Sequence, residues 1–258
     1  MKLYGKYLLM HLKSQMQYKV SFFLQVAAQF LLAFFALLGV WFMMTRFQTV
    51  EEFTFPEVLI GFAVVQTGFA IAEGGARSFD MFPRLISNGA FDRMLMRPRG
   101  LIFQVLASEM DFSRLWNILQ AALVLAYAIP ASGILWTPDK ILTLIMMIVC
   151  GAVVFSCLFL IYAAISFFTI EGLEFMNVLT DGGREFGRYP FSVYGKGVLK
   201  FLTCIVPLAL FQYYPLLYLI GRETSKFYIF LPLVSLLFVF PAYGMWRFGL
   251  KHYKSTGS

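Results

Sequence analysis

Six apolar blocks, each about 20 residues long or more, constrain this chain more than any other feature of its sequence. A helix needs about 20 consecutive apolar residues to cross the roughly 30 Å of hydrocarbon in a bilayer. The composition agrees, because 60% of the residues are hydrophobic and only 14% are charged, against about 45–50% and about 25% in soluble domains. The blocks predict spans at about Val20–Thr45, Pro56–Ala76, Leu115–Leu135, Ile141–Phe168, Val198–Ile220 and Tyr228–Trp246. We therefore expect an all-α integral membrane protein.

Positive charges are distributed unevenly over the segments that connect these blocks. Of the 21 Lys and Arg residues, 17 lie in the N-terminal segment, in residues 77–114, in residues 168–200 or in the C-terminal segment. Cytoplasmic connections carry the excess of Lys and Arg in membrane proteins. Both termini and both of these loops are therefore predicted to face the cytoplasm. The same asymmetry accounts for the net charge of +7, so no nucleic-acid partner is needed to explain it.

Residues 1–258 are predicted to form a single transmembrane domain. Its expected parts are an N-terminal helix (1–19), spans 1–2 (20–76), a cytoplasmic loop (77–114), spans 3–4 (115–168), a second cytoplasmic loop (169–197), spans 5–6 (198–248) and a cytoplasmic tail (249–258). On a helix, the lysines of residues 1–19 fall on one side and most of the Leu and Tyr residues on the other. This pattern is typical of an amphipathic helix that lies in the headgroup plane. A frayed basic leader is the alternative.

Motifs for catalysis are missing from the sequence. It contains no His-Glu-x-x-His, no Gly-x-Ser-x-Gly and no Gly-x-x-x-x-Gly-Lys-Ser/Thr, so a zinc protease, a serine hydrolase and a nucleotide-binding loop all lack their signatures. The three cysteines lie inside apolar blocks without Cys-x-x-Cys spacing, which favours packing over metal binding. We predict no catalytic residue, no metal site and no cofactor bound by this chain.

Polar side chains occur in pairs within the first three blocks. Each pair has helical spacing and therefore shares a helix face. Because polar groups are costly in lipid, these faces are expected to point toward protein or water. The pairs either line a substrate pathway or fix helix packing through interhelical hydrogen bonds, which contribute about 0.6 kcal/mol on average in membranes. They are Gln25 with Gln29, Gln66 with Glu73, and Asn117 with Gln120.

Two prolines interrupt the fifth block. Pro207 and Pro215 each remove a helix hydrogen bond, which predicts a broken or re-entrant helix at the outer leaflet. Such a break is tolerated only where protein or water satisfies the freed carbonyls. Tyr213 and Tyr214 would then lie at the outer interface, where tyrosine is favoured.

The loop over 77–114 contains the basic stretch "NGAFDRMLMRPRG" at 88–100. Pro83 is placed for the first turn of a helix, and Gly89 for a left-handed cap that ends this turn. Asp92 is predicted to cap a second short helix, which Pro98 stops. The resulting basic, amphipathic knob suits docking on a soluble partner. Contact between its arginines and lipid phosphates is the alternative.

Four groups of residues resemble the permease subunits of ABC-2 type ATP-binding-cassette exporters, in particular the bacterial six-span branch. The resemblance covers nearly the whole chain. The groups are Ile86, Gly89, Asp92, Leu95, Arg97 and Pro98; Tyr189, Pro190 and Tyr194; Pro207, Tyr213, Tyr214 and Pro215; and Trp246, Gly249, Tyr253, Ser255, Gly257 and Ser258.

This resemblance implies roles for the features described above. The N-terminal helix would be an elbow on the inner leaflet, and the break near Pro207, Tyr213, Tyr214 and Pro215 an outer gate. A coupling helix would dock on the ATPase through Ile86, Gly89, Phe91, Asp92, Arg93, Leu95, Arg97 and Pro98. The charged residues of the second loop, Glu171, Glu174, Arg184, Glu185 and Arg188, would form another ATPase contact.

The resemblance also implies partners and a location. Two copies of a separate ATPase would bind ATP and Mg²⁺, and a second permease subunit, identical or homologous, would complete the pathway in a bacterial cytoplasmic membrane. The substrate expected to leave the cell is hydrophobic or amphipathic. Two other functions remain open at this stage, a membrane enzyme that modifies lipid and a non-catalytic membrane scaffold.

Overall fold

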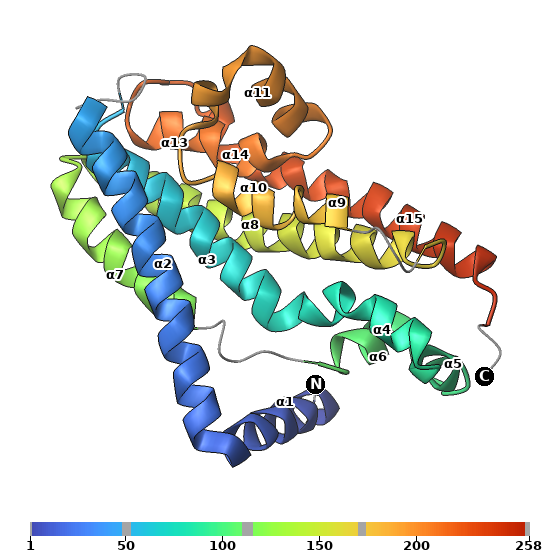
Figure 1. Ribbon diagram of the computed structural model, residues 1–258. Coiled ribbons are helices and arrows are strands. Elements are labelled where there is room, and N and C mark those ends of the chain that lie inside the picture. The colour runs from blue at the N-terminus through green and yellow to red at the C-terminus, as the bar shows by residue number, and fades with distance from the viewer. Residues whose placement is uncertain (1, 48–52, 110–115, 170–173, 256–258) are drawn as a thin grey trace.

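The computed structural model describes residues 2–47, 53–109, 116–169 and 174–255, most of which are helical (Figure 1). The longer helices are α1 (Lys2–Gln15), α2 (Lys19–Phe47), α3 (Phe55–Asp80), α7 (Trp116–Ala131), α8 (Pro138–Ile165), α11 (Gly195–Cys204), α14 (Phe227–Ser235) and α15 (Val239–His252). The shorter ones are α4 (Phe82–Ser87), α5 (Ala90–Leu95), α6 (Leu101–Leu106), α9 (Glu174–Asn177), α10 (Asp181–Phe186), α12 (Leu208–Phe211) and α13 (Tyr213–Leu219). Short 3₁₀ turns join α1 to α2 (η1, Met16–Tyr18), precede α11 (η3, Phe191–Tyr194) and join α14 to α15 (η4, Leu236–Phe238).

Four helical stretches among the described residues are long and apolar enough to cross a membrane. They are Lys19–Arg46, Phe55–Ser87, Pro138–Ile165 and Phe227–His252, and a bent pair, Phe191–Cys204 with Leu208–Leu219, makes a fifth if it counts as one span. The third predicted span corresponds to α7, which has 16 residues and is shorter than a full crossing requires. An all-helical, multi-pass architecture is confirmed, while a sixth crossing stays a prediction.

Helices α3 and α8 form the centre of the molecule. α3 packs against α8 and α7, and α8 packs in turn against α14 and α15 (Figure 1). A methyl group added at Gly68 would lie 3.2 Å from the backbone of Gly151 and Ala152, so the absence of a side chain lets α3 and α8 approach closely. The apolar stretch of α3 is 78% buried, whereas that of α2 is only 17% buried. Most of α2 is therefore left to face lipid or another protein.

The fifth block is bent, as the prolines predicted, and the sharp bend lies between Cys204 and Leu208, where Pro207 is the N-cap of α12. α11 ends at Cys204 and α12 begins at Leu208, and the two parts meet at 89°. From there α12 and α13 run past the middle of α8 to its first turn, because Phe211 contacts Phe155 (ring centroids 5.9 Å apart) and Tyr218 donates to Asp139. Only α12 and α13, the second half of this block, pack along α8 as a membrane span would.

α1, α5 and the C-terminal tail lie at the same end of the molecule (Figure 1). His11 Nε2 donates to the carbonyl of Ala107 over 3.0 Å, and Tyr253 Oη donates to Asp92 over 3.0 Å. α1 forms the helix predicted for residues 1–19 and bends away from α2 at η1. Its placement on the inner leaflet stays a prediction.

Candidate functional site

The predicted coupling segment folds as two short helices joined by a left-handed glycine. α4 has Pro83 in its first turn, and Asn88 ends it. Gly89 has φ 66°, a left-handed value that glycine adopts without strain, as predicted. The Asn88 side-chain oxygen accepts from the Ala90 amide over 3.0 Å and starts α5.

Asp92 does not cap this helix, which corrects one prediction. Gly89 is the N-cap, and Asp92 lies within the first turn of α5. Its carboxylate instead accepts hydrogen bonds from Tyr253 Oη (3.0 Å) and Ser255 Oγ (2.9 Å), both in the C-terminal tail. The prediction was wrong because the donors are more than 160 residues away in sequence, and the local sequence around Asp92 does not indicate them. Burial, followed by the bond to Asp92, raises the pKa of Tyr253 to about 12, so the phenol keeps its donor proton.

An aromatic cluster joins α5 to the main helices. Phe91 is fully buried, and its ring centroid lies 4.9 Å from that of Phe82, 5.5 Å from that of Phe167 and 5.1 Å from that of Tyr253. Phe167 follows the end of α8, and its ring lies 5.2 Å from that of Trp246 on α15. Aromatic pairs at these separations attract each other beyond their burial alone. The aromatic cluster therefore joins α5 directly to the ends of α8 and α15.

The predicted coupling residues separate into two groups by exposure. Ile86 and Phe91 are buried and face the rest of the chain. Arg93, Leu95, Arg97 and Pro98 are exposed, and Met96 between them is 87% exposed. An apolar side chain so exposed between arginines is what a protein contact would cover.

Gln104 on α6 holds the exposed loop in place. Its side-chain amide donates to the carbonyls of Met94 (3.1 Å) and Arg99 (3.0 Å). A cavity of about 640 Å³ lies between this loop and α1, where Tyr7 and His11 face Arg97 and Arg99. Sequence reasoning missed Gln104, because a glutamine after a glycine and a short apolar run gives no signal of its partners.

Residues 181–188 lie against the middle of α3, whereas the sequence analysis expected a second cytoplasmic loop over 169–197. Arg184 lies over the Phe69 ring, 4.7 Å from its centroid, and a methyl group at Gly187 would lie 2.7 Å from Val65. At 1.5 Å per residue, Phe69 is about 16 Å along α3 from Asp80, the end that leads into α4. Glu171 lies outside the described residues, as does the side chain of Glu174.

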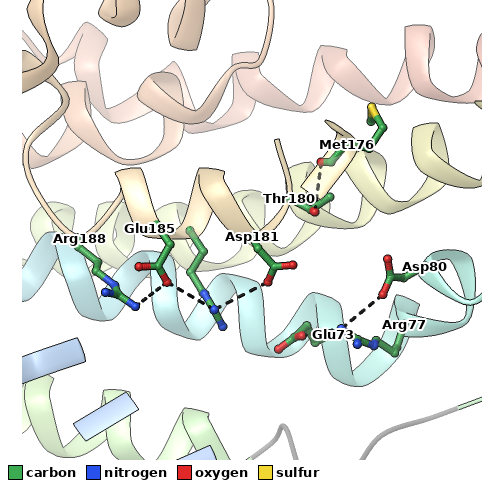
Figure 2. A network of polar contacts seen from close by, with 9 residues as sticks. Glu73, Arg77, Asp80, Met176, Thr180, Asp181, Glu185 and Arg188 are labelled. Atoms are coloured by element: carbon green, nitrogen blue, oxygen red, sulfur yellow. Dashed lines mark hydrogen bonds and ion pairs between the residues drawn. The ribbon is translucent and has the colours of Figure 1, made fainter. Parts of the chain in front are cut away.

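Charge counting placed this segment outside the spans because it treats each arginine as a loop signal. In the structure, the charges of α10 pair with one another. Arg184 Nη2 lies 3.7 Å from Asp181 Oδ1 and 3.4 Å from Glu185 Oε1, and Arg188 also pairs with Glu185. Figure 2 shows Asp181, Glu185 and Arg188 beside α3. A balanced, paired set of charges is the form in which ionic groups are tolerated within a membrane domain.

Three of the six predicted pathway residues meet in one polar pocket of about 240 Å³. Gln29 of α2, Gln66 of α3 and Asn117 of α7 line it together with Arg184, Glu185 and Arg188. Gln66 and Asn117 are buried. The pocket thus contains side chains from four segments that are far apart in sequence.

The other three predicted pathway residues lie elsewhere. Gln120 is buried and lines a separate, apolar pocket. Glu73 is fully buried and pairs with Arg77 over 2.8 Å on the same helix, and Arg77 also approaches Asp80 (Figure 2). Gln25 is exposed on α2. Glu73 and Gln25 therefore do not line the polar pocket.

Of the predicted outer-gate residues, Tyr213, Tyr214 and Pro215 lie toward the end opposite α5, near the first turns of α3 and α8. Pro207 lies nearer the middle of α8, because the next residue, Leu208, lies against Gly183, as does Phe155 of α8. Tyr213 faces Phe53, with ring centroids 6.4 Å apart, and Tyr214 Oη lies 3.2 Å from Thr203 Oγ1. Pro215 is buried, and Pro207 begins α12. Gln212, which the sequence analysis did not select, is buried against Gly61.

Within the described parts of the chain, no group of three or more His, Cys, Asp or Glu residues is arranged to hold a metal ion. The long apolar helices among the described residues define a helical multi-pass membrane protein.

The sequence profile of the family described as "ABC-2 family transporter protein" matches residues 30–257, so this chain belongs to that family. The resemblance found in the sequence is thereby confirmed. ABC-2 permeases are the membrane components of ABC transporters, and the family implies a separate ABC ATPase as partner. No curated protein and no solved structure matches the chain.

Proposed function

We propose that this chain is the permease subunit of an ATP-driven exporter and that its ATPase docks on the exposed side of α5. The observation that carries the proposal is the two-sided construction of this helix. Arg93, Met96 and Arg97 are exposed, while Phe91 and Asp92 on the other side hold the helix to α8, α15 and the tail. Such a helix binds a partner on one side and moves the bundle with the other.

The proposed cycle converts ATPase closure into helix movement. Closure of two ATPase copies around ATP and Mg²⁺ displaces α5, and the aromatic cluster passes the displacement to Phe167 and Trp246. Because α8 packs against α3 along much of its length, the displacement reaches the polar pocket and the segment around Tyr213 and Tyr214. Packed cores of this kind switch between discrete arrangements rather than deform continuously.

The proposed direction is export of a hydrophobic or amphipathic molecule through the bundle. The polar pocket contains balanced charges rather than an ordered series of one sign, which disfavours a route for small ions. Pro207, Tyr213, Tyr214 and Pro215 are proposed as the outer gate because Tyr213, Tyr214 and Pro215 lie toward the end opposite α5 and Pro207 lies at the bend that leads to them.

The proposed orientation places α5 and both described ends of the chain in the cytoplasm of a bacterium. With Arg184 and Arg188 paired inside the bundle, the orientation rests on the basic residues of the N-terminal segment, residues 77–114 and the tail, 13 in number. A second permease subunit is proposed to cover the exposed face of α2.

Co-purification of the chain with its ATPase from detergent tests this proposal. Arg93→Glu with Arg97→Glu reverses two exposed charges four residues apart on the docking side. Arg247→Glu with Lys251→Glu makes the same change at exposed positions four apart on α15 and serves as the matched control. We expect an ATP-binding subunit to accompany wild type and the control, and to be reduced about tenfold or more with the docking variant.

Two results would contradict the proposal. Well-folded wild type that brings down no nucleotide-binding protein would remove the energy source and return the arginines to lipid contact. If the co-purified ATPase were reduced equally in both double variants, general surface charge, and not α5, would govern the association.

A further inference from the structure

Two pockets of opposite character lie between the same three helices. The polar pocket, about 240 Å³, is lined by Gln29 of α2, Gln66 of α3 and Asn117 of α7. An apolar pocket of about 430 Å³ is lined by Phe34 and Trp41 of α2, Leu59 of α3, and Val124 and Tyr127 of α7. Pockets of this size class accommodate small-molecule ligands.

On α3 and α7 the helical register places the two pockets one after the other, while on α2 their lining residues interleave between Gln29 and Trp41, so the pockets adjoin along this helix. Gln66 and Leu59 are seven residues apart on α3, and Asn117 and Val124 are seven apart on α7. A separation of seven residues is two turns, so each pair shares a face and is offset by about 10 Å along its helix. The polar pocket lies toward the α5 end of the bundle, and the apolar pocket toward the opposite end.

The charged side chains that line the polar pocket are already paired, so the pocket does not require a charged ligand. Arg184 is paired with Asp181 and Glu185, and Arg188 with Glu185, so the two positive and two negative charges balance. A bare carboxylate or ammonium group could enter only by disrupting one of these pairs or by remaining without a counter-charge beside the buried Gln66 and Asn117.

The same walls leave one donor and one acceptor unused. Among the described residues, no hydrogen-bond partner lies near the Asn117 side-chain oxygen or the Arg184 Nε–H group, and both atoms are buried. Asn117 is only 3% exposed, and buried polar atoms in native proteins are almost always bonded. An occupant with both an acceptor and a donor would satisfy the two atoms.

We infer that this crevice binds an amphipathic molecule whose head is uncharged and carries hydroxyl or amide groups. The head lies between Asn117 and Arg184, and the hydrocarbon tail extends past Phe34 toward Trp41 and Tyr127. The inference rests on the proposed function, since it names the substrate class for the proposed pathway.

Photolabelling of the purified full-length chain with three lipid probes tests the inference. A monoacylglycerol, a fatty acid and an alkylamine share one hydrocarbon tail with a photoreactive diazirine, so they differ only in head group and charge. We expect saturable labelling of peptides from α2 and α7 around Trp41 and Tyr127 by the monoacylglycerol. Unlabelled monoacylglycerol should compete about tenfold better than the other two, because only its head avoids breaking an ion pair.

Two variants separate the head and tail contributions. Asn117→Leu removes the unused acceptor and should weaken labelling about five- to tenfold. Asn177→Leu, the same change at an exposed position on α9, should leave labelling unchanged. Leu123→Trp adds bulk within the apolar pocket, which Asn117 and Arg184 do not line, and should abolish labelling around Trp41, which keeps the test decisive if Asn117→Leu does not fold.

Non-saturable labelling, equal competition by the fatty acid, or wild-type labelling of a folded Asn117→Leu protein would each overturn the inference. The labelling needs no ATPase, so it is separate from the co-purification experiment. If the ATPase associates but no probe labels the crevice, the inference fails while the permease function stands. If the crevice is labelled but no ATPase associates, the proposed permease function fails while the inference about ligand binding stands.

Discussion

Single residues of the C-terminal tail determine how firmly α5 is held. Trp246, Gly249, Tyr253 and Ser255 contributed to the family resemblance without any physical role in the sequence analysis. The structure gives each a contact: Trp246 lies in the aromatic cluster, Gly249 lies against the end of α8, and Tyr253 and Ser255 donate to Asp92. Their common effect is to join the docking helix to the last span.

Removing the two hydroxyl donors should loosen α5 without unfolding the bundle. In the double variant Tyr253→Phe with Ser255→Ala, Asp92 loses both of these hydroxyl donors, and each bond to a charged group contributes about 1.5–3 kcal/mol when well shielded. We expect tryptic cleavage after the exposed Arg93 and Arg99 to become at least about fivefold faster, while the melting transition of the spans hardly changes. Unchanged cleavage would show that the tail does not restrain α5.

The pH dependence of this restraint follows from Tyr253, whose pKa is raised from 10.0 to about 12. A raised tyrosine pKa means that the native state favours the protonated form, so its contribution is complete below about pH 10 and is lost as the pH rises toward 12. The hydrogen bond should therefore be constant throughout the neutral range.

Gly249 should tolerate no side chain. A methyl group there would lie 2.6 Å from the Phe167 ring and 2.7 Å from the carbonyl oxygen of Ala164, and a backbone atom cannot move aside without shifting the helix. We expect Gly249→Ala to destabilise the protein by about 1–3 kcal/mol, measured as a lower melting temperature in detergent. Gly244→Ala on the same helix, where nothing lies within 4 Å, is the matched control and should be neutral or slightly stabilising. Equal stability of the two variants would contradict the packing of α15 on α8.

At the scale of elements, the placement of α10 distinguishes this structure from the topology expected from charge. Gly187 lies against Val65 in the middle of α3, where an added methyl group would come within 2.7 Å of both Val65 methyl groups. Gly187→Ala should therefore displace α10, lower the melting temperature and weaken any binding in the polar pocket. Gly197→Ala on α11 meets nothing within 4 Å and should have little effect. If residues 181–188 were a cytoplasmic loop, both substitutions would be nearly silent.

Local patterns predicted the elements well and their long-range partners poorly. The long apolar blocks, the left-handed Gly89 and the bend near Pro207 follow from length, backbone freedom and proline geometry, all of which act within a few residues. The position of Arg184 could not be predicted this way, because an arginine in a loop and an arginine paired inside a bundle have the same local sequence. The prediction that Asp92 caps α5 was wrong for the same reason. A carboxylate near a helix start often caps the helix, but here donors that are distant in sequence bind it instead. Gln29, Gln66 and Asn117 were selected from the sequence as members of polar pairs, but the structure separates each pair, and the meeting of these three residues in one pocket depends on the packing of three helices.

At the scale of the whole molecule, the least covered helix indicates where a second subunit belongs. Only 17% of the apolar stretch of α2 is buried, and Gln25 is exposed on it, although a polar side chain facing lipid is costly. We expect Gln25→Cys, with Cys150, Cys157 and Cys204 replaced by serine or alanine, to crosslink to a second permease chain in membranes. Phe23→Cys, two residues away and pointing to a different side of α2, should crosslink much less. Equal crosslinking at both positions would indicate random encounter rather than an interface.

The most direct test of a docking helix is to ask what touches it in the cell. A photoreactive amino acid in place of Met96, which is 87% exposed beside α5, should crosslink to a protein with an ATP-binding motif. The same amino acid in place of Leu135, 83% exposed at the opposite end of the molecule, should give no such product. Crosslinks from Met96 to lipid alone, or an ATPase captured from Leu135, would contradict the proposal that α5 connects this permease to its source of energy.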